Sequence, residues 1–219
     1  MVSETGQSIV IPEVRVYEAR RGEDIVLKDI SVDTYYACDS EGRVMYFNLD
    51  EGKSYLEKRG KSLASLPLLV NLYIALDELA RQDEVAAQVL HQLNAAWDRT
   101  GTSISAAGRI VHSDAILGEI TYEGLTVPQE ASGNIVDLFG KNEQFFQALL
   151  GVRDTDRLAD VATMHDLVPY YWYPRGERLV MFGGGDFYYM HHHIPDLLMV
   201  FCDDEPHPRR VARGVWVGR

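Results

Sequence analysis

The stretch from Leu66 to Ala80 constrains the fold of this chain most strongly, because its apolar residues leave no clearly polar side. Ser65 stands where an N-cap residue is expected, and Pro67 falls in the first turn, where a helix does not need the missing amide. A helix that is apolar all round must be covered by other elements on every side. We therefore expect a buried central helix over residues 66–80. Its large apolar residues are Leu66, Leu68, Leu69, Val70, Leu72, Tyr73, Ile74, Leu76 and Leu79.

The rest of the chain shows strand-like and helical patterns in blocks rather than in strict alternation. Strand-like segments fill residues 8–48 and 102–127, and short aromatic strands fill residues 170–217. A second helix is expected over residues 85–97 and a third over residues 135–150. Blocks of this kind favour an α+β fold, with a largely antiparallel sheet packed around the buried central helix.

The length of the chain bears on its domain organisation. With 219 residues it suits one domain that buries a sizeable core. We therefore expect residues 1–219 to form a single α+β domain. The alternative is a subdivision near residue 130, where a loop separates the second block of strands from the third helix.

The charge of the chain argues against several classes of partner. The formal net charge is −12 at pH 7, which repels polyanions, so neither nucleic-acid binding nor membrane binding is expected. The first residues resemble no signal peptide, and the most apolar stretch, residues 63–76, is too interrupted to span a bilayer. Cys38 and Cys202 fit no metal or disulfide pattern and are expected to be small buried residues. We expect a soluble, cytoplasmic protein.

Aromatic residues concentrate in the last quarter of the chain. Consecutive side chains of a strand point to opposite faces, so the run at 170–173 cannot lie on one face alone. Tyrosine and tryptophan suit contact surfaces, because they combine a large apolar area with a polar group. The leading hypothesis is a non-enzymatic binding or assembly protein, which self-associates as a homo-oligomer or holds a protein partner, with a small-molecule ligand as a further option. Its surface would consist of Tyr170, Tyr171, Trp172, Tyr173, Phe187, Tyr188 and Tyr189.

Three consecutive histidines give a second hypothesis, a metal-dependent hydrolase or related enzyme. On a strand His191 and His193 point to the same side, and two imidazoles at that spacing can hold one divalent metal ion. Carboxylates nearby in the sequence would complete the coordination, namely Asp186, Asp203 and Glu205. The sequence leaves open whether the protein is an enzyme and whether it uses a divalent metal as cofactor.

Basic residues ahead of the central helix give a third hypothesis, an anion- or nucleotide-binding regulator. Lys58, Arg59 and Lys61 lie next to the expected helix N-terminus, where free amides and the helix dipole favour an anion. The segments 52–54 and 60–62 both read Gly-Lys-Ser, which matches the last three residues of a phosphate-binding loop. Both segments lack the earlier glycine that such a loop requires.

Two pairs of polar residues are given no part in these hypotheses. Asp77 and Glu78 are expected to line the polar side of the helical pair. His165 and Asp166 are adjacent and could act as an acid–base couple, although such a pair near a helix end is more often a surface feature.

Overall fold

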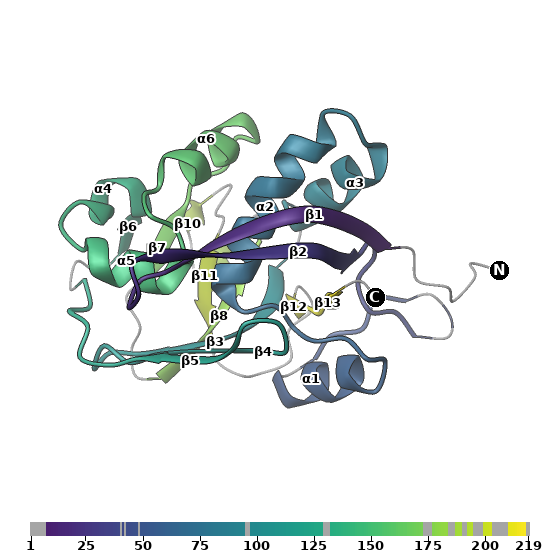
Figure 1. Ribbon diagram of the computed structural model, residues 1–219, viewed down its shortest axis with the longest axis horizontal. Helices are drawn as coiled ribbons and strands as arrows, with labels where there is room; N and C mark the ends of the chain where they lie inside the picture. The colour runs from purple at the N-terminus through teal and green to yellow at the C-terminus, as the bar shows by residue number, and fades with distance from the viewer. Residues whose placement is uncertain are drawn as a thin grey trace.

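The structure is a computed structural model of the chain. It describes residues 8–39, 41, 43–47, 49–94, 97–128, 132–172, 177–183, 187–189, 192–194, 199–202 and 210–217. In Figure 1 a long hairpin crosses in front of a helical layer, and a second sheet lies below it. Within the described part of the chain, no helix has the length and apolar character needed to cross a membrane.

The hairpin consists of β1 (Ser8–Glu18) and β2 (Glu23–Asp33), which pair antiparallel along their whole length. Its turn contains Gly22 at a φ of 69°, a conformation that favours glycine. On the other edge of β2 lies β13 (Val215–Val217), also antiparallel. Residues of β1 alternate between core and solvent, as the period of a strand requires, but the alternation shifts by one residue at Pro12 and Glu13. The buried ones are Ile9, Ile11, Val14 and Val16.

The second sheet has the strand order β11-β8-β3-β4-β5, and its neighbouring strands are antiparallel. A short strand, β12 (Arg210–Val211), runs parallel to β3. Gly101 lets β3 approach β4 closely, because a Cβ atom there would lie 1.9 Å from the carbonyl oxygen of Ser113. The strands are β3 (Trp97–Ser105), β4 (Ile110–Asp114), β5 (Gly118–Tyr122), β8 (Glu177–Phe182) and β11 (Met199–Cys202).

Helix α2 (Leu66–Ala80) lies between the hairpin and the second sheet (Figure 1). It contacts β1, β3 and β8, and also the helices α3 (Glu84–Leu93), α5 (Glu143–Leu150) and α6 (Asp156–Met164). Most of its apolar residues are buried, while Ile74 and Leu79 are partly buried and Glu78 is exposed. The predicted α+β fold around a buried central helix at 66–80 is confirmed.

Shorter elements complete the architecture. Helix α1 (Leu49–Glu57) falls in the basic segment before α2, which the sequence did not predict as a helix. Helix α4 (Ile135–Phe139) precedes α5. The structure also has two short antiparallel pairs of strands. One pair is β6 (Ser132–Asn134) with β7 (Tyr170–Trp172), and the other is β9 (Phe187–Tyr189) with β10 (His192–Ile194).

The second helix is shorter than predicted. It was expected over residues 85–97, but α3 ends at Leu93 with Asn94 as its C-cap, and Trp97 already begins β3. Asparagine is a weak helix former, and it favours helix ends and turns. The residues that follow are held in the sheet by partners from distant parts of the chain, which no local pattern reveals.

The third helix is broken in two. It was expected over residues 135–150, but α4 and α5 are separated by residues 140–142. Gly140 is the C-cap of α4 and Asn142 is the N-cap of α5, so both residues act as helix ends rather than as interior positions. Gly151 ends α5 in the left-handed conformation with a φ of 64°, which favours glycine at a helix C-terminus.

The N-terminus of α2 is capped by distant residues and not by Ser65. The Ser65 hydroxyl makes no cap hydrogen bond, which corrects the expectation. Instead, the Ser65 amide donates to Oδ2 of Asp114 at 3.1 Å, and the Leu66 amide donates to the hydroxyl oxygen of Thr102 at 2.8 Å. Unsatisfied amides at a buried helix end would be costly, so the sheet supplies the acceptors.

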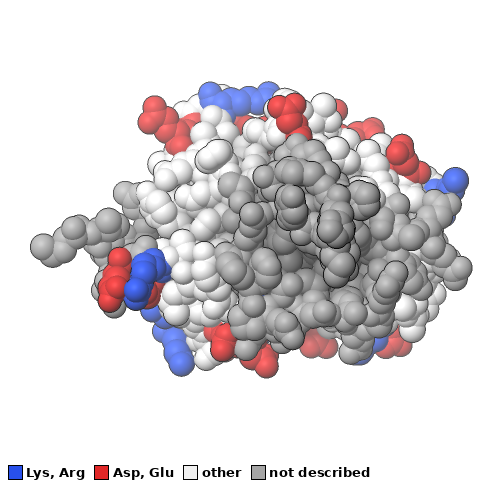
Figure 2. Space-filling view, turned by 180° about the vertical axis from the view of Figure 1, so that it is seen from behind, with Lys and Arg blue, Asp and Glu red and all other residues white. Residues whose placement is uncertain are grey.

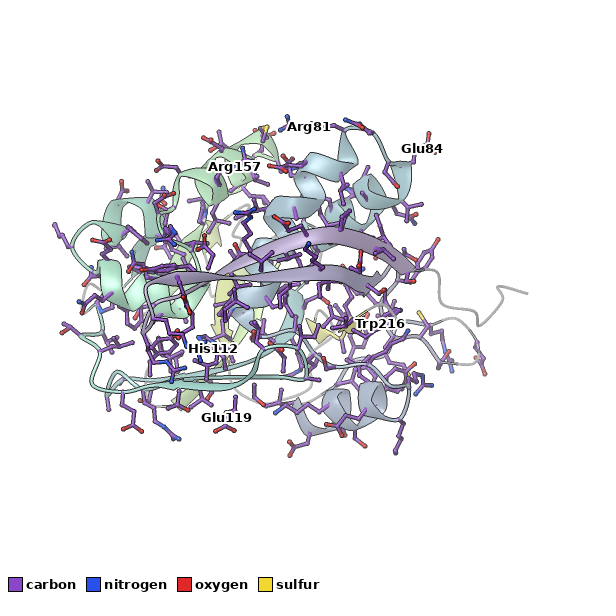
Figure 3. The ribbon with its side chains drawn as sticks, in the orientation of Figure 1. Arg81, Glu84, His112, Glu119, Arg157 and Trp216 are labelled. Atoms are coloured by element: carbon purple, nitrogen blue, oxygen red, sulfur yellow. The ribbon has the colours of Figure 1, made fainter. Side chains whose placement is uncertain are left out.

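His112 extends this contact into a chain of hydrogen bonds. Its Nε2 lies 2.8 Å from the carbonyl oxygen of Ala148, and its Nδ1 lies 2.8 Å from the hydroxyl of Thr102. A carbonyl only accepts, so Nε2 carries the proton and Nδ1 accepts from Thr102. Burial lowers the pKa of His112 to about 4, so the ring is neutral. Figure 3 shows it between the second sheet and the helical layer.

Candidate functional site

A pocket of about 400 Å³ lies where α2 and α3 meet the C-terminal end of α6. Its volume is near the lower end of the range for small-molecule sites, roughly 300–1,000 Å³. Figure 3 shows Arg81 at the end of α2, on the same side of the molecule as Arg157 of α6. The apolar lining residues are Ala80, Ala87 and Leu90, and the polar ones are Asp77, Arg81, His91, Asn94 and His165.

Asp77 is the buried anchor of this pocket, with only 6% of its surface exposed. Its Oδ2 accepts a hydrogen bond from Arg81, one helical turn further along α2, at 3.1 Å. Its Oδ1 lies 3.3 Å from Nε2 of His165. Partners of this kind offset the high cost of removing a carboxylate from water. Asp77 was expected to line the polar side of the helical pair, but it is buried, because α6 packs against this side of α2.

The partner of His165 is likewise different from the one expected. His165 is the C-cap of α6 and contacts Asp77, whereas the adjacent Asp166 takes a left-handed backbone conformation with a φ of 56°. A carboxylate on one ring nitrogen fixes the orientation of an imidazole and leaves its other nitrogen available. The pair therefore presents an oriented histidine to the pocket.

Tyr73 supports the pocket from the core side. Its hydroxyl donates to Oδ1 of Asn94 at 2.9 Å, and its ring meets that of His165 edge-on at 6.5 Å. Burial, with the charge of Asp77, raises the pKa of Tyr73, so the hydroxyl remains a donor. With its oxygen occupied, Asn94 presents its amide Nδ2 as a donor.

The pocket offers more donors than acceptors. Both oxygens of Asp77 are engaged by Arg81 and His165. The other N–H groups of Arg81, the ring of His91 and Nδ2 of Asn94 have no hydrogen-bond partner among the residues that the structure describes. An arginine, two histidines and an asparagine amide surround one carboxylate whose oxygens are both engaged, so the donors suit a ligand that accepts hydrogen bonds.

The predicted aromatic surface is described only in part. Tyr171 is fully buried and packs edge-on against the rings of Phe145 and Phe146, with centroids 5.6 and 5.4 Å away. Its assignment to a contact surface is therefore wrong, because inward alternation on β7 places it in the core. Tyr170, its neighbour on the same strand, is half-buried.

The other aromatic residues lie beyond what the structure describes in side-chain detail. Tyr173 is outside the described residues. Trp172 lies in β7, and Phe187, Tyr188 and Tyr189 form β9, but only their backbone is described. Self-association through these residues stays a prediction.

The predicted metal site also stays a prediction. His193 lies in β10, where only the backbone is described. The other four proposed ligands are outside the described residues, namely His191, Asp186, Asp203 and Glu205. Within the described part of the chain, no group of three or more histidine, cysteine, aspartate or glutamate residues could hold a metal ion.

Two of the three basic residues before α2 make contacts with neighbouring side chains. Lys61 lies 2.5 Å from Oδ1 of Asp33 and 4.5 Å from the ring centre of Trp216. Arg59 stacks over the ring of Tyr55 at 3.7 Å, and Lys58 is exposed.

The helix N-terminus beside these residues is already in use. The amides of Ser65 and Leu66 bond to Asp114 and Thr102, so an anion would have to displace these groups. Figure 2 shows described charges of both signs scattered around the outline of that view, not gathered in one patch. Anion binding by the three basic residues stays a prediction, but without the two amides that motivated it.

Comparison with protein-family models, with curated protein sequences and with solved structures finds no match to this chain. The assignment of a function therefore rests on the geometry of the pocket.

Sequence reasoning missed the pocket, although one signal pointed to it. Asp77 and Arg81 stand four residues apart at the end of a helix that is mostly apolar. A carboxylate in a helix that must be buried needs a partner, and that requirement could have marked Asp77 as a structural or functional centre. His165 could not have been identified as the second partner, because it lies 88 residues away in the sequence.

Proposed function

We propose that this protein binds a small molecule that carries a carboxylate or phosphate group, in the pocket between α2, α3 and α6. The observation that carries the proposal is the buried Asp77, which holds Arg81 and His165 at the pocket. This keeps the hypothesis of a binding protein but assigns it a different site from the aromatic one.

The chemistry of the lining indicates the class of ligand. Asp77 has its charge offset by Arg81, and both of its oxygens are engaged. The donors of Arg81, His91 and Asn94 would then contact the acidic group, since hydrogen bonds to a charged group are the stronger kind. Ala80, Ala87 and Leu90 would contact the carbon part of the ligand.

A binding screen with matched variants tests the proposal. The probes are inorganic phosphate, small mono- and dicarboxylates and sugar phosphates, first by thermal shift and then by calorimetry. A ligand at about 100 times its Kd adds roughly 2.7 kcal/mol to the free energy of unfolding. Arg81→Gln and Asp77→Asn should each raise the Kd by about tenfold or more, because a charge-assisted hydrogen bond contributes about 1.5–3 kcal/mol.

Arg157→Gln is the matched control. Arg157 lies in α6 and pairs with Glu78, which follows Asp77 in α2. Neither Arg157 nor Glu78 lines the pocket. Its replacement should leave the Kd unchanged. The proposal fails if no probe binds the wild-type protein, or if Arg81→Gln and Asp77→Asn bind as tightly as the wild type does.

A catalytic use of the same pocket is the second candidate, and the contact between His165 and Asp77 favours it. An imidazole oriented by a carboxylate can accept a proton from water that attacks a bound ester. Turnover of carboxylic and phosphate esters should then disappear in His165→Gln while binding of the acidic product persists. Turnover that is the same in wild type and His165→Gln would exclude this candidate.

A further inference from the structure

Arg213 is a buried arginine, 3% exposed, that joins several segments beside the pocket. Its Nη1 donates to the carbonyl oxygen of Asp33 at 2.6 Å, and its Nη2 donates to Oε1 of Gln92 at 3.1 Å. Its Nε lies 3.5 Å from Oδ2 of Asp98, and its guanidinium stacks over the ring of Tyr36 at 4.7 Å. Arg213 thus ties the end of β2 and the start of β3 to the last turn of α3.

Tyr36 holds the same turn through the main chain. Its hydroxyl donates to the carbonyl oxygen of Gln92. The last four carbonyls of a helix lack the usual partner four residues ahead, and this bond adds to the contact that the Asn94 amide makes with the Gln92 carbonyl. Gln92 is therefore held twice, by Arg213 through its side chain and by Tyr36 through its backbone.

The residues next to Gln92 belong to the pocket. His91 and Asn94 line it, whereas Gln92, Tyr36 and Arg213 do not. Consecutive residues of a helix point about 100° apart, so one turn can face the pocket with some residues and the buried arginine with another. The turn is therefore anchored on one side and exposed to a ligand on the other.

We propose that Tyr36 and Arg213 are positioning residues for the ligand pocket. By holding Gln92 they fix the last turn of α3, so that His91 and Asn94 keep the placement in which they contact an acidic group. The inference rests on the proposed function, but the restraint on α3 can be measured without a ligand.

The benefit of this anchoring lies in preorganisation. A donor that is already fixed loses less conformational entropy when the ligand binds, and this difference appears directly in the affinity. Within the described part of the chain, neither Tyr36 nor Arg213 makes a hydrogen bond to a lining residue, so their replacement should act on affinity by loosening the turn that carries Gln92.

The test compares two tyrosine variants with the same local chemistry. Tyr36→Phe keeps the ring beneath Arg213 but removes the hydroxyl bond to Gln92. Tyr55→Phe is the matched control, because the Tyr55 hydroxyl donates to the carbonyl oxygen of Cys38 at 3.2 Å and its ring also lies beneath an arginine. Tyr55 packs on a separate small core around Phe47, away from the pocket.

Two measurements are made on each variant. Amide hydrogen exchange follows residues 90–94 in the ligand-free protein, and calorimetry gives the Kd of the tightest-binding probe among the phosphates and carboxylates. Loss of one hydrogen bond of about 1 kcal/mol should speed exchange at 90–94 and raise the Kd, each by about fivefold. Tyr55→Phe should change neither by more than about twofold.

Gln92→Met removes the contact with Arg213 without disturbing the buried charge, and it should act as Tyr36→Phe does.

The outcomes separate this inference from the proposed function. Unchanged exchange and Kd in both Tyr36→Phe and Gln92→Met would overturn the inference, even where the pocket binds its ligand. Faster exchange spread over the whole chain would overturn it too, because that result means a general loss of stability. If no probe binds the wild type, the proposed function fails, while faster exchange confined to 90–94 still supports the restraint. If Tyr36→Phe does not fold, Gln92→Met decides the matter.

Discussion

The buried imidazole of His112 leads to a quantitative prediction for stability against pH. Burial lowers its pKa from 6.5 to about 4, and both ring nitrogens are already committed, to Thr102 and to Ala148. One pKa unit corresponds to about 1.4 kcal/mol. The difference between the folded and unfolded states therefore amounts to about 3 kcal/mol, which is a large share of the stability of an ordinary domain.

The sign follows from which state takes up the proton first. As the pH falls through 6.5, the unfolded chain binds a proton at this histidine and the folded chain does not, so unfolding becomes easier. The loss grows until the pH reaches about 4, where the folded protein takes up the proton as well. Above about pH 7.5 the contribution of His112 is constant.

Urea unfolding at pH 7.5 and at pH 4 measures this effect. Other groups titrate in the same range, and Asp98, whose pKa burial raises to about 6, acts in the opposite direction. The comparison is therefore between wild type and His112→Gln, in which the drop between the two pH values should be smaller by about 3 kcal/mol. Leu149→Ala, a buried variant without a titrating group, should keep the wild-type drop. An equal drop in wild type and His112→Gln would refute the reasoning.

The remaining predictions concern packing and assembly. Gly101→Ala would place a Cβ 1.9 Å from the Ser113 carbonyl oxygen and should cost about 3 kcal/mol in urea unfolding. Gly140→Ala meets nothing within 4 Å at a helical backbone conformation and should be neutral or slightly stabilising, so equal costs for the two would contradict the packing of β3 on β4. Tyr171→Ala should cost about 3–5 kcal/mol, because its ring is buried, and a cost below about 1 kcal/mol would contradict that burial. Trp172→Ala should lower the mass seen in light scattering if the aromatic strands assemble the protein, and an unchanged mass would count against that surface.

Strand β3 shows where sequence patterns stop being informative. Asp98, Arg99, Thr100 and Thr102 are at most 2% exposed, yet their polar character argues against a central strand. The hydroxyl of Thr100 donates to the carbonyl oxygen of Val180, and the partners of Asp98, Arg99 and Thr102 include Arg213, Phe47 and Leu66, which are also distant in the sequence. Burial of these residues depends on those partners, so no window of local sequence contains the reason for it.

The central helix was predictable because its evidence is local. The apolar residues of 66–80 fix both its type and its burial, and the strands β1 and β2 lie within the block 8–48 that was expected to be strand-like. The pocket depends both on local sequence and on partners that are distant in the sequence. The pairing of Asp77 with Arg81 is a matter of helix spacing, whereas the arrival of His165 depends on how α6 packs against α2.

The pairing of β13 with β2 has a consequence for synthesis of the chain. Residues 215–217 complete a sheet that residues 8–33 begin, so one edge of β2 keeps open amide and carbonyl groups until residues 215–217 have also left the ribosome. An open edge can pair with the wrong neighbour and promote aggregation. Production in cells should therefore respond to chaperone supply, and deletion of 215–217 should yield insoluble material even though the pocket lies elsewhere.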